Sequence, residues 1–236
     1  MDLLPGRLAR LCLLVLCCTF TCIPGLAQEP DYALPDYALI DTANADNGKV
    51  LADGERCQEC HGVDGNIPSN NEAGKIPRLA GQHPAYLLKQ FNDFRSGARE
   101  HDFMALMART VDDETAVDII AHYAAQPIMK GSGAGDNLSG KKLYLEGDNS
   151  RQIQACANCH GLDGKGVTKN HPSPIPGLAP ELIPVIGGQD WHYLEQQLRD
   201  WRSGTRTNSI DGVMNKVTAK LNDGEINALT DYISGL

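Results

Sequence analysis

The sequence predicts an all-α protein built from two similar halves. Apolar residues recur at helical spacing in four segments, and no stretch alternates between apolar and polar residues as a half-buried strand would. Several short motifs occur twice, in the same order. The predicted helices are few and short for a half of about 100 residues, and helices of this length are marginal without tertiary packing. A large apolar cofactor at the centre of each half would supply that packing.

The first strong helix signal begins at Pro84, a residue suited to a helix N-terminus. Apolar side chains follow at Leu87, Phe91 and Phe94, and Gly97 is placed to end the helix. The second half repeats this spacing with Leu194, Leu198, Trp201 and Gly204.

Each half also ends on a predicted amphipathic helix. The apolar stripes are Val117, Ile120 and Ala124 in the first half, and Ile226, Leu229 and Ile233 in the second. Asn222, followed three residues later by Glu225, predicts a capping pair at the start of the last helix.

Composition and charge narrow the class of protein. The chain has 236 residues, of which 42% are apolar and 22% charged, the balance of a globular protein. With 21 basic and 30 acidic residues its formal net charge is −9, which disfavours binding to the phosphates of a nucleic acid. The charge is uneven, −8 over residues 28–130 and −2 over residues 131–236.

The N-terminal segment is typical of a secretory signal peptide over residues 1–27. Arg7 and Arg10 precede an apolar run from Leu11 to Phe20, and small residues lead to a cleavage site after Ala27. An uncleaved anchor is the alternative, but the run is shorter than the ~20 apolar residues that span a bilayer. We therefore expect an exported, periplasmic protein with at most peripheral membrane association. Residues 28–46 form an acidic leader, which we expect to be flexible.

The repeats predict two tandem domains, residues 47–125 and 139–236, joined by a glycine-rich linker, residues 126–138. The segment Cys57–Gly62 (CQECHG) returns 99 positions later as CANCHG. The segment PRLAGQ, residues 77–82, parallels PVIGGQ, residues 184–189, and FRSGAR, residues 94–99, parallels WRSGTR, residues 201–206. A repeat near 105 residues is too long for a solenoid unit and fits a duplicated domain.

The chemistry lies in the two C-x-x-C-H motifs. A Cys-x-x-Cys pair can be a redox dithiol, half of a zinc site, a disulfide or a heme attachment, and a following histidine selects heme attachment. The predicted attachment residues are Cys57 and Cys60 in the first half, and Cys156 and Cys159 in the second. His61 and His160 are then placed to ligate the irons. Zinc would need further ligands, and the chain after Ala27 has no spare cysteine.

A second axial ligand is expected for each iron. Met214 is the candidate of the second half, which contains no other methionine. In the first half Met104 is preferred because it lies nine residues before Asp113, as Met214 lies nine before Asp223. Met107 stays the rival, because it lies eight residues after Arg99, as Met214 does after Arg206.

Other candidates have supporting roles. Pro77 and Pro184 are expected to supply the carbonyl oxygens that hold the ligating histidines. Four repeated arginines, Arg95, Arg99, Arg202 and Arg206, are either partners of heme propionates or solvated helix ends. The remaining histidines, His83, His101, His122, His171 and His192, are expected to be surface or helix residues, with His101 kept in view because it lies near Met104.

These motifs resemble those of class I c-type cytochromes duplicated in tandem, and most closely the diheme cytochrome c4 family. The resemblance covers roughly residues 47–236 and includes the motif pairs above, with Tyr86 and Tyr193 four residues after their glutamines. It implies two covalent hemes c with axial pairs His61/Met104 and His160/Met214. Residues 31–46 and 149–155 depart from the family pattern.

The resemblance also implies a function, the shuttling of single electrons between redox proteins in the periplasm. Expected partners are a terminal oxidase, a cytochrome bc1-type donor or a flavoprotein dehydrogenase. Two alternatives stay open. The first is the heme subunit of a flavocytochrome sulfide dehydrogenase. The second is a diheme enzyme of the peroxidase or thiosulfate dehydrogenase type, which would need an open or exchangeable iron.

Overall fold

The computed structural model describes residues 37–67, 76–131, 133, 135–166, 175–176 and 178–236. The predicted signal peptide and the first part of the leader, residues 28–36, lie outside these residues. Within them no strand occurs, and one isolated bridge pairs Asp148 with Ile153, so the predicted all-α class is confirmed. No helix in the described part of the chain is long and apolar enough to span a bilayer.

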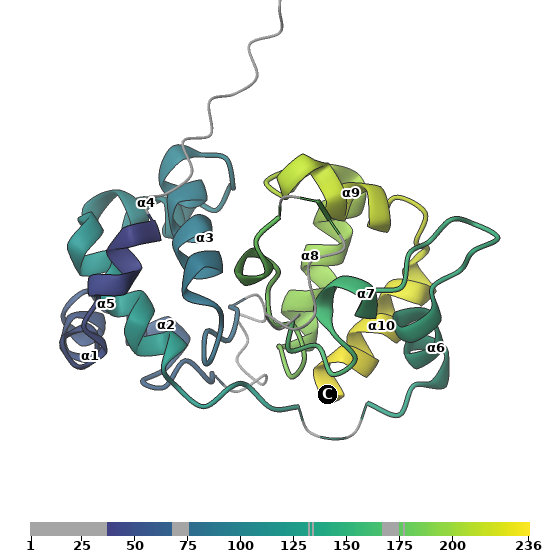
Figure 1. The fold of residues 1–236 in the computed structure, drawn as a ribbon, viewed down its shortest axis with the longest axis horizontal. Helices are drawn as coiled ribbons and strands as arrows, with labels where there is room; N and C mark the ends of the chain where they lie inside the picture. Colours follow the sequence, from purple (N-terminus) through teal and green to yellow (C-terminus); the bar gives the residue numbers. More distant parts are fainter. Residues whose placement is uncertain (1–36, 68–75, 132, 134, 167–174, 177) are drawn as a thin grey trace, which may run out of the picture. The chain divides into compact units, whose positions relative to one another are not determined.

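The first half contains both of its predicted helices, α3 (Pro84–Ser96) and α5 (Asp113–Ala124), among further ones (Figure 1). The others are the 3-10 helix η1 (Tyr37–Thr42), α1 (Ala45–Gly54), α2 (Cys57–His61) and α4 (Asp102–Thr110). As predicted, Pro84 starts α3, and Gly97 ends it in the left-handed conformation, with φ 84°.

The second half repeats the five α-helices in the same order, without a counterpart of η1 and with two other 3-10 turns (Figure 1). Its elements are α6 (Leu138–Glu146), α7 (Ala157–His160), η2 (Pro180–Leu182), α8 (Trp191–Ser203), η3 (Ile210–Gly212), α9 (Val213–Thr218) and α10 (Asp223–Gly235). Gly204 ends α8 as Gly97 ends α3, with φ 80°. The predicted capping box is confirmed, because Asn222 and Glu225 exchange side-chain and backbone hydrogen bonds.

In each half the first helix packs against the last, α1 against α5 and α6 against α10. A glycine makes each approach close. A Cβ atom on Gly48 would lie 1.8 Å from the carbonyl oxygen of Asp118, and one on Gly140 would lie 1.9 Å from that of Ala228. The helix backbones therefore touch at the same place in both halves, and larger residues there would force them apart.

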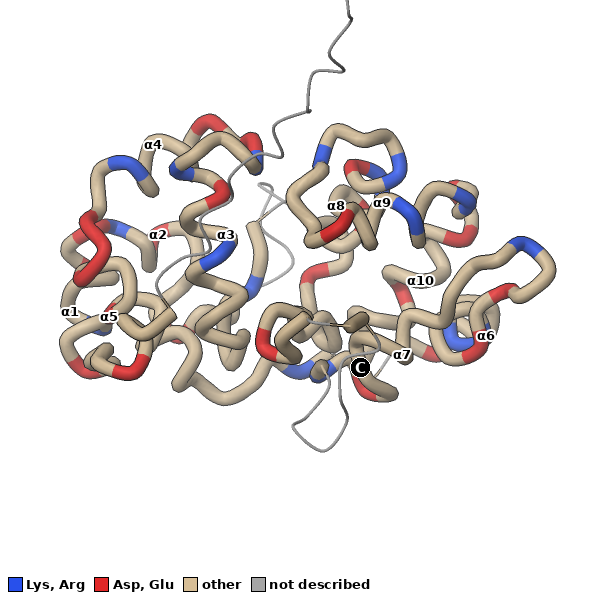
Figure 2. The backbone as a smooth tube through the Cα atoms, turned by 45° about the horizontal axis from the view of Figure 1, so that its top comes forward, with Lys and Arg blue, Asp and Glu red and all other residues tan. Residues whose placement is uncertain are grey.

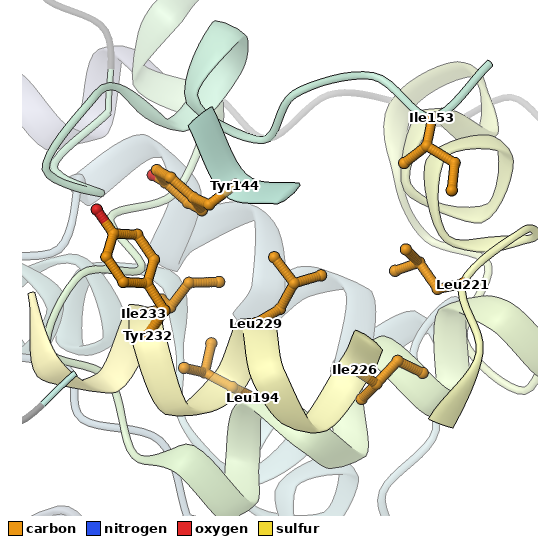
Figure 3. Close-up of a cluster of buried hydrophobic side chains, with 8 residues drawn as sticks. All are labelled: Tyr144, Ile153, Leu194, Leu221, Ile226, Leu229, Tyr232 and Ile233. Carbon is orange, nitrogen blue, oxygen red and sulfur yellow. The ribbon is translucent and has the colours of Figure 1, made fainter. Parts of the chain in front are cut away.

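Apolar side chains from α6, α8 and α10 form the core of the second half. Figure 3 shows its buried members Tyr144, Ile153, Leu194, Leu221, Ile226, Leu229, Tyr232 and Ile233. The first half has two smaller clusters, one around Tyr123 and Ala52 and the other around Leu88 and Ile120.

From Tyr37 onward, part of the leader packs against the first half. Residues 37–42 form η1, and Tyr37, Leu39 and Ile40 pack against the buried cluster that contains Leu88 and Ile120. The apolar side chains of this part of the leader thus contact a hydrophobic surface on α3 and α5, and its flexibility stays a prediction.

The described part of the segment between the halves is held by burial and by backbone hydrogen bonds. Met129 is 1% exposed, and the amide of Gly131 donates to the carbonyl oxygen of Leu236 at 3.2 Å. Gly81, with φ 64°, leaves room for this segment, since a Cβ there would lie 2.4 Å from Ile128 Cα. The division into two domains at residues 126–138 stays a prediction.

Residues 149–155, which precede the second C-x-x-C-H motif, form a turn anchored at both ends. Asp148 accepts hydrogen bonds from Ser150 and Arg151, and the backbones of Asp148 and Ile153 exchange two hydrogen bonds of 2.8 Å. Arg151 also pairs with Glu225 on α10. The extra residues thus rest on the last helix, and Ile153 is buried in the core.

Candidate heme site

The two C-x-x-C-H motifs form the short helices α2 and α7. Each ends at a glycine with positive φ, 78° at Gly62 and 79° at Gly161. Such backbone favours glycine, because other residues meet a steric penalty there. The chain therefore turns directly after each histidine, at the point where the motif ends.

None of the four cysteines forms a disulfide. Burial raises the pKa of the Cys57 thiol to about 11 and that of the Cys156 thiol to about 12. Both groups are therefore neutral thiols near pH 7. Thiols in C-x-x-C-H are the groups that form thioether bonds with heme vinyl groups.

Both motif histidines are buried and held by a backbone carbonyl. His61 Nδ1 lies 3.1 Å from the carbonyl oxygen of Pro77, and His160 Nδ1 lies 3.0 Å from that of Pro184. Because a carbonyl only accepts, Nδ1 must donate, which leaves Nε2 with the free lone pair that an iron ligand needs. Burial lowers the pKa of both imidazoles, so both are neutral near pH 7. The predicted proline partners are confirmed.

A cavity of about 780 Å³ brings the predicted site residues together. Both cysteine pairs and both histidines line it, and so do Met104, Met107 and Met214. Met129 is buried elsewhere, against the loop at Ala80. Apolar side chains such as Leu87, Phe91 and Leu198 form much of the wall. Paired thiols, a histidine with a free Nε2 and an apolar wall together fit a covalently attached porphyrin.

Equivalent contacts follow α4 and α9, the two helices that carry Met104 and Met214. Arg95 donates to the carbonyl oxygen of Val111 at 2.8 Å, and Arg202 donates to that of Leu221 at 3.0 Å. Arg95 also pairs with Asp113, and Arg202 with Asp223. These contacts make Val111 and Leu221 equivalent positions.

Counting back from these positions aligns the methionines. Met104 lies seven residues before Val111, and Met214 lies seven before Leu221, whereas Met107 lies only four before Val111. The fully buried residues Ala108 and Thr218 take the same place in this alignment. The structural register therefore matches Met104 with Met214.

None of the four repeated arginines is a solvated helix end. Arg95 and Arg202 are, in addition, not free to bind a propionate. Those two bind backbone carbonyls and aspartates, as described above. Arg99 and Arg206 instead lie between the halves. Arg99 donates to Tyr193 and Gln197, each at 2.9 Å, and Arg206 donates to Gln90 at 2.9 Å.

This arginine pair gives the cavity a positively charged wall. Arg206 is 8% exposed, and both guanidinium groups stack on rings, Arg99 on Phe94 and Arg206 on Trp201. Burial would raise the pKa of the Tyr193 hydroxyl, but the two guanidinium groups outweigh it and lower that pKa. The wall is suited to an anionic group of a ligand.

Two of the other histidines, His101 and His122, form hydrogen bonds within the protein. His122 is buried, and its Nε2 lies 2.9 Å from the carbonyl oxygen of Val63. His101 lines the cavity and caps α4, because its Nδ1 accepts from the amide of Met104 at 3.3 Å. His171 lies outside the described residues.

Comparison with known proteins relates the chain to c-type cytochromes. A cytochrome c family model matches residues 138–236. Cytochrome c4 of Pseudomonas aeruginosa is 37% identical over 183 residues, which cover 76% of this chain and 83% of that protein. A thiosulfate dehydrogenase electron acceptor of Stutzerimonas stutzeri is 33% identical, over 76% of this chain and 78% of that protein. The crystal structure of reduced recombinant cytochrome c4 from Pseudomonas stutzeri matches with a TM-score of 0.68 at 33% identity, covering 82% of this chain and 99% of that one.

Proposed function

Because this chain belongs to the cytochrome c4 family, we propose that it works in the periplasm. It is a c-type cytochrome with two covalent hemes c, and it carries electrons. In the periplasm it takes single electrons from respiratory or sulfur-oxidising donors and passes them to acceptors such as a terminal oxidase. The heme irons supply the chemistry, which is one-electron exchange between Fe(III) and Fe(II). The residues of the chain set where and how readily that exchange occurs.

The residues divide the work in the same way in each half. Cys57 and Cys60 attach the first heme through thioether bonds, and Cys156 and Cys159 attach the second. His61 and His160 are the proximal ligands. The observation that carries this assignment is the pair of Nδ1–carbonyl hydrogen bonds, which leave a lone pair on each Nε2.

Met104 and Met214 are the second axial ligands in this proposal. Met214 is the only methionine of the second half, and the shared register supports Met104 over Met107. A thioether ligand opposite histidine favours Fe(II) and so raises the potential, which suits late steps of respiration.

If each iron is held by one histidine and one methionine of the chain, no open position would remain for oxygen, peroxide or another substrate. The experiment that tests this is ligand binding to the purified holoprotein. We expect a redox titration to show two one-electron steps, and we expect carbon monoxide and cyanide to leave the native spectrum unchanged. Rapid uptake of either ligand at neutral pH would contradict the carrier assignment and favour a diheme enzyme.

A second candidate partner is favoured by the similarity to a thiosulfate dehydrogenase electron acceptor. In that case the donor is a sulfur-oxidising dehydrogenase rather than a respiratory complex. Stopped-flow reduction of the oxidised holoprotein by a purified thiosulfate dehydrogenase, compared with reduction by a cytochrome bc1-type complex, distinguishes the two donors. A permanent flavoprotein complex, the alternative from the sequence, predicts co-purification with a flavin-containing subunit.

A further inference from the structure

Two glutamines bridge the halves in a reciprocal way. Gln82, just before α3, exchanges two hydrogen bonds with the backbone of Val185, of 2.8 and 2.9 Å. Gln189, just before α8, does the same with the backbone of Arg78, at 2.9 and 2.8 Å. Both glutamine side chains are almost fully buried, with 4% of each residue exposed, and both line the cavity.

The backbone partner of each glutamine is the peptide group that holds a ligating histidine. The carbonyl oxygen of Pro184 accepts from His160 Nδ1, and the same peptide unit donates its N–H, that of Val185, to Gln82 Oε1. In the first half the peptide between Pro77 and Arg78 accepts from His61 and donates to Gln189. One peptide therefore connects each histidine with the glutamine of the opposite half.

Consecutive hydrogen bonds that share one peptide group strengthen one another. An acceptor on the N–H side of a peptide increases the negative charge on its carbonyl oxygen, which then accepts more strongly. A stronger acceptor at Nδ1 makes the imidazole a more basic iron ligand. A more basic ligand stabilises Fe(III) relative to Fe(II) and lowers the potential.

We propose that Gln82 is a positioning residue for the second heme and Gln189 for the first, each lowering the potential of the heme in the opposite half through one peptide. This inference rests on the proposed ligand roles of His61 and His160. It goes beyond those ligand roles because it assigns a function to two glutamines that hydrogen-bond to neither histidine. Each glutamine belongs, in sequence, to the half opposite the heme that it affects.

The test uses the full-length holoprotein with Gln82→Leu and, separately, Gln189→Leu. Leucine fills a similar volume and accepts no hydrogen bond. NMR-monitored redox titration, with the methyl signals of each heme resolved, gives the two potentials separately. We expect Gln82→Leu to shift the redox equilibrium of the second heme towards Fe(II) by roughly two- to tenfold, where tenfold is about 59 mV for one electron. The first heme should shift by less than about twofold. Gln189→Leu should give the reverse pattern.

A second measurement separates this effect from loosening of the contact between the halves. In the reduced protein the Nδ1 proton of each axial histidine reports its own hydrogen bond. We expect Gln82→Leu to move the His160 signal upfield and to leave the His61 signal in place.

Three results would overturn the inference: equal shifts at both hemes, a shift only at the heme of the same half, or no shift. The charge-transfer band of thioether-ligated Fe(III), at the red end of the visible spectrum, is recorded for each variant. If it is missing from the unmutated protein, the ligand assignment itself fails. If it is present throughout while the potentials do not follow the crossed pattern, only the role of the glutamines fails.

Discussion

Tyr123 and Tyr144 make equivalent hydrogen bonds in the two halves, although they lie on helices that are not equivalent. Tyr123, on the last helix of the first half, donates to the carbonyl oxygen of Gly62 at 3.2 Å. Tyr144, on the first helix of the second half, donates to that of Gly161 at 2.7 Å. Both acceptors directly follow the motif histidines, so each hydroxyl holds the turn that ends a C-x-x-C-H helix.

We expect Tyr123→Phe and Tyr144→Phe each to reduce the free energy of unfolding by about 1 kcal/mol, because each removes a hydrogen bond to a half-buried carbonyl. Burial raises the pKa of both hydroxyls, so both remain protonated donors at neutral pH. Guanidinium denaturation of the holoprotein, followed by the heme spectrum, measures the change. The control is Tyr232→Phe, because Tyr232 packs on Tyr144 and lies in the same cluster. A loss no larger than that of the control would show that the two hydroxyls contribute little.

Local signals in the sequence were sufficient to predict the heme motifs and four of the helices, α3, α5, α8 and α10. Pro84, Gly97 and the Asn222–Glu225 capping pair mark helix ends through backbone geometry and nearby hydrogen bonds, which depend on few residues. The proline carbonyls that hold the histidines were also predictable, because each lies at the same point of a repeat.

Contacts between distant segments were not predictable in this way. Gln82 and Gln189 stood out as repeated residues, but their crossed pairing depends on how the two halves meet, which no local pattern encodes. Arg99 and Arg206 likewise donate hydrogen bonds to side chains of the opposite half, in addition to contacts within their own half. The packing of η1 was missed because acidic composition suggested solvation, while Tyr37, Leu39 and Ile40 fit a surface formed later in the chain.

The register of the methionines gives a direct prediction for the first heme. Met104→Leu should remove the thioether charge-transfer band of that heme and open its iron to carbon monoxide, because leucine offers no ligand atom. Met107→Leu is the matched control on the same helix and should keep the band, with a stability loss below about 1.5 kcal/mol for a volume-conserving exchange. Optical and magnetic circular dichroism spectra of the oxidised proteins measure the outcome. The reverse pattern would assign Met107 as the ligand.

Asp223 predicts a dependence of stability on pH. Hydrogen bonds from Arg202, then from Arg199, hold the pKa of this carboxyl below its ordinary value. A group whose pKa is lower in the folded state stabilises the protein above its unfolded pKa, about 3.9, and loses this contribution as pH falls through the folded value. Asp223→Asn should therefore destabilise the protein at pH 6, and the difference should shrink as pH falls below the unfolded pKa and through the lower folded one. Urea denaturation across this range measures it.

Asp231→Asn provides the control for that series, since Asp231 is exposed on the same helix. We expect its effect to be smaller at pH 6, as is usual for surface substitutions away from specific contacts. If Asp223→Asn destabilised the protein equally at pH 2 and pH 6, the contribution of Asp223 would come from helix capping or packing rather than from its charge.

The uneven charge predicts that the two hemes respond differently to salt. Acidic residues recur on α1 and α5 of the first half (Figure 2), and residues 28–130 carry −8 against −2 for residues 131–236. The Debye length falls from about 30 Å at 0.01 M salt to about 10 Å at 0.1 M, so added salt screens this field. Reduction of the first heme by a small cationic complex should slow with rising salt, and reduction by an anionic complex of similar size should accelerate. Stopped-flow kinetics, with the hemes distinguished through the Met104→Leu spectrum, should show weaker changes at the second heme. Equal salt dependence at both hemes would mean that the whole molecule, rather than the nearer half, sets the field at each heme.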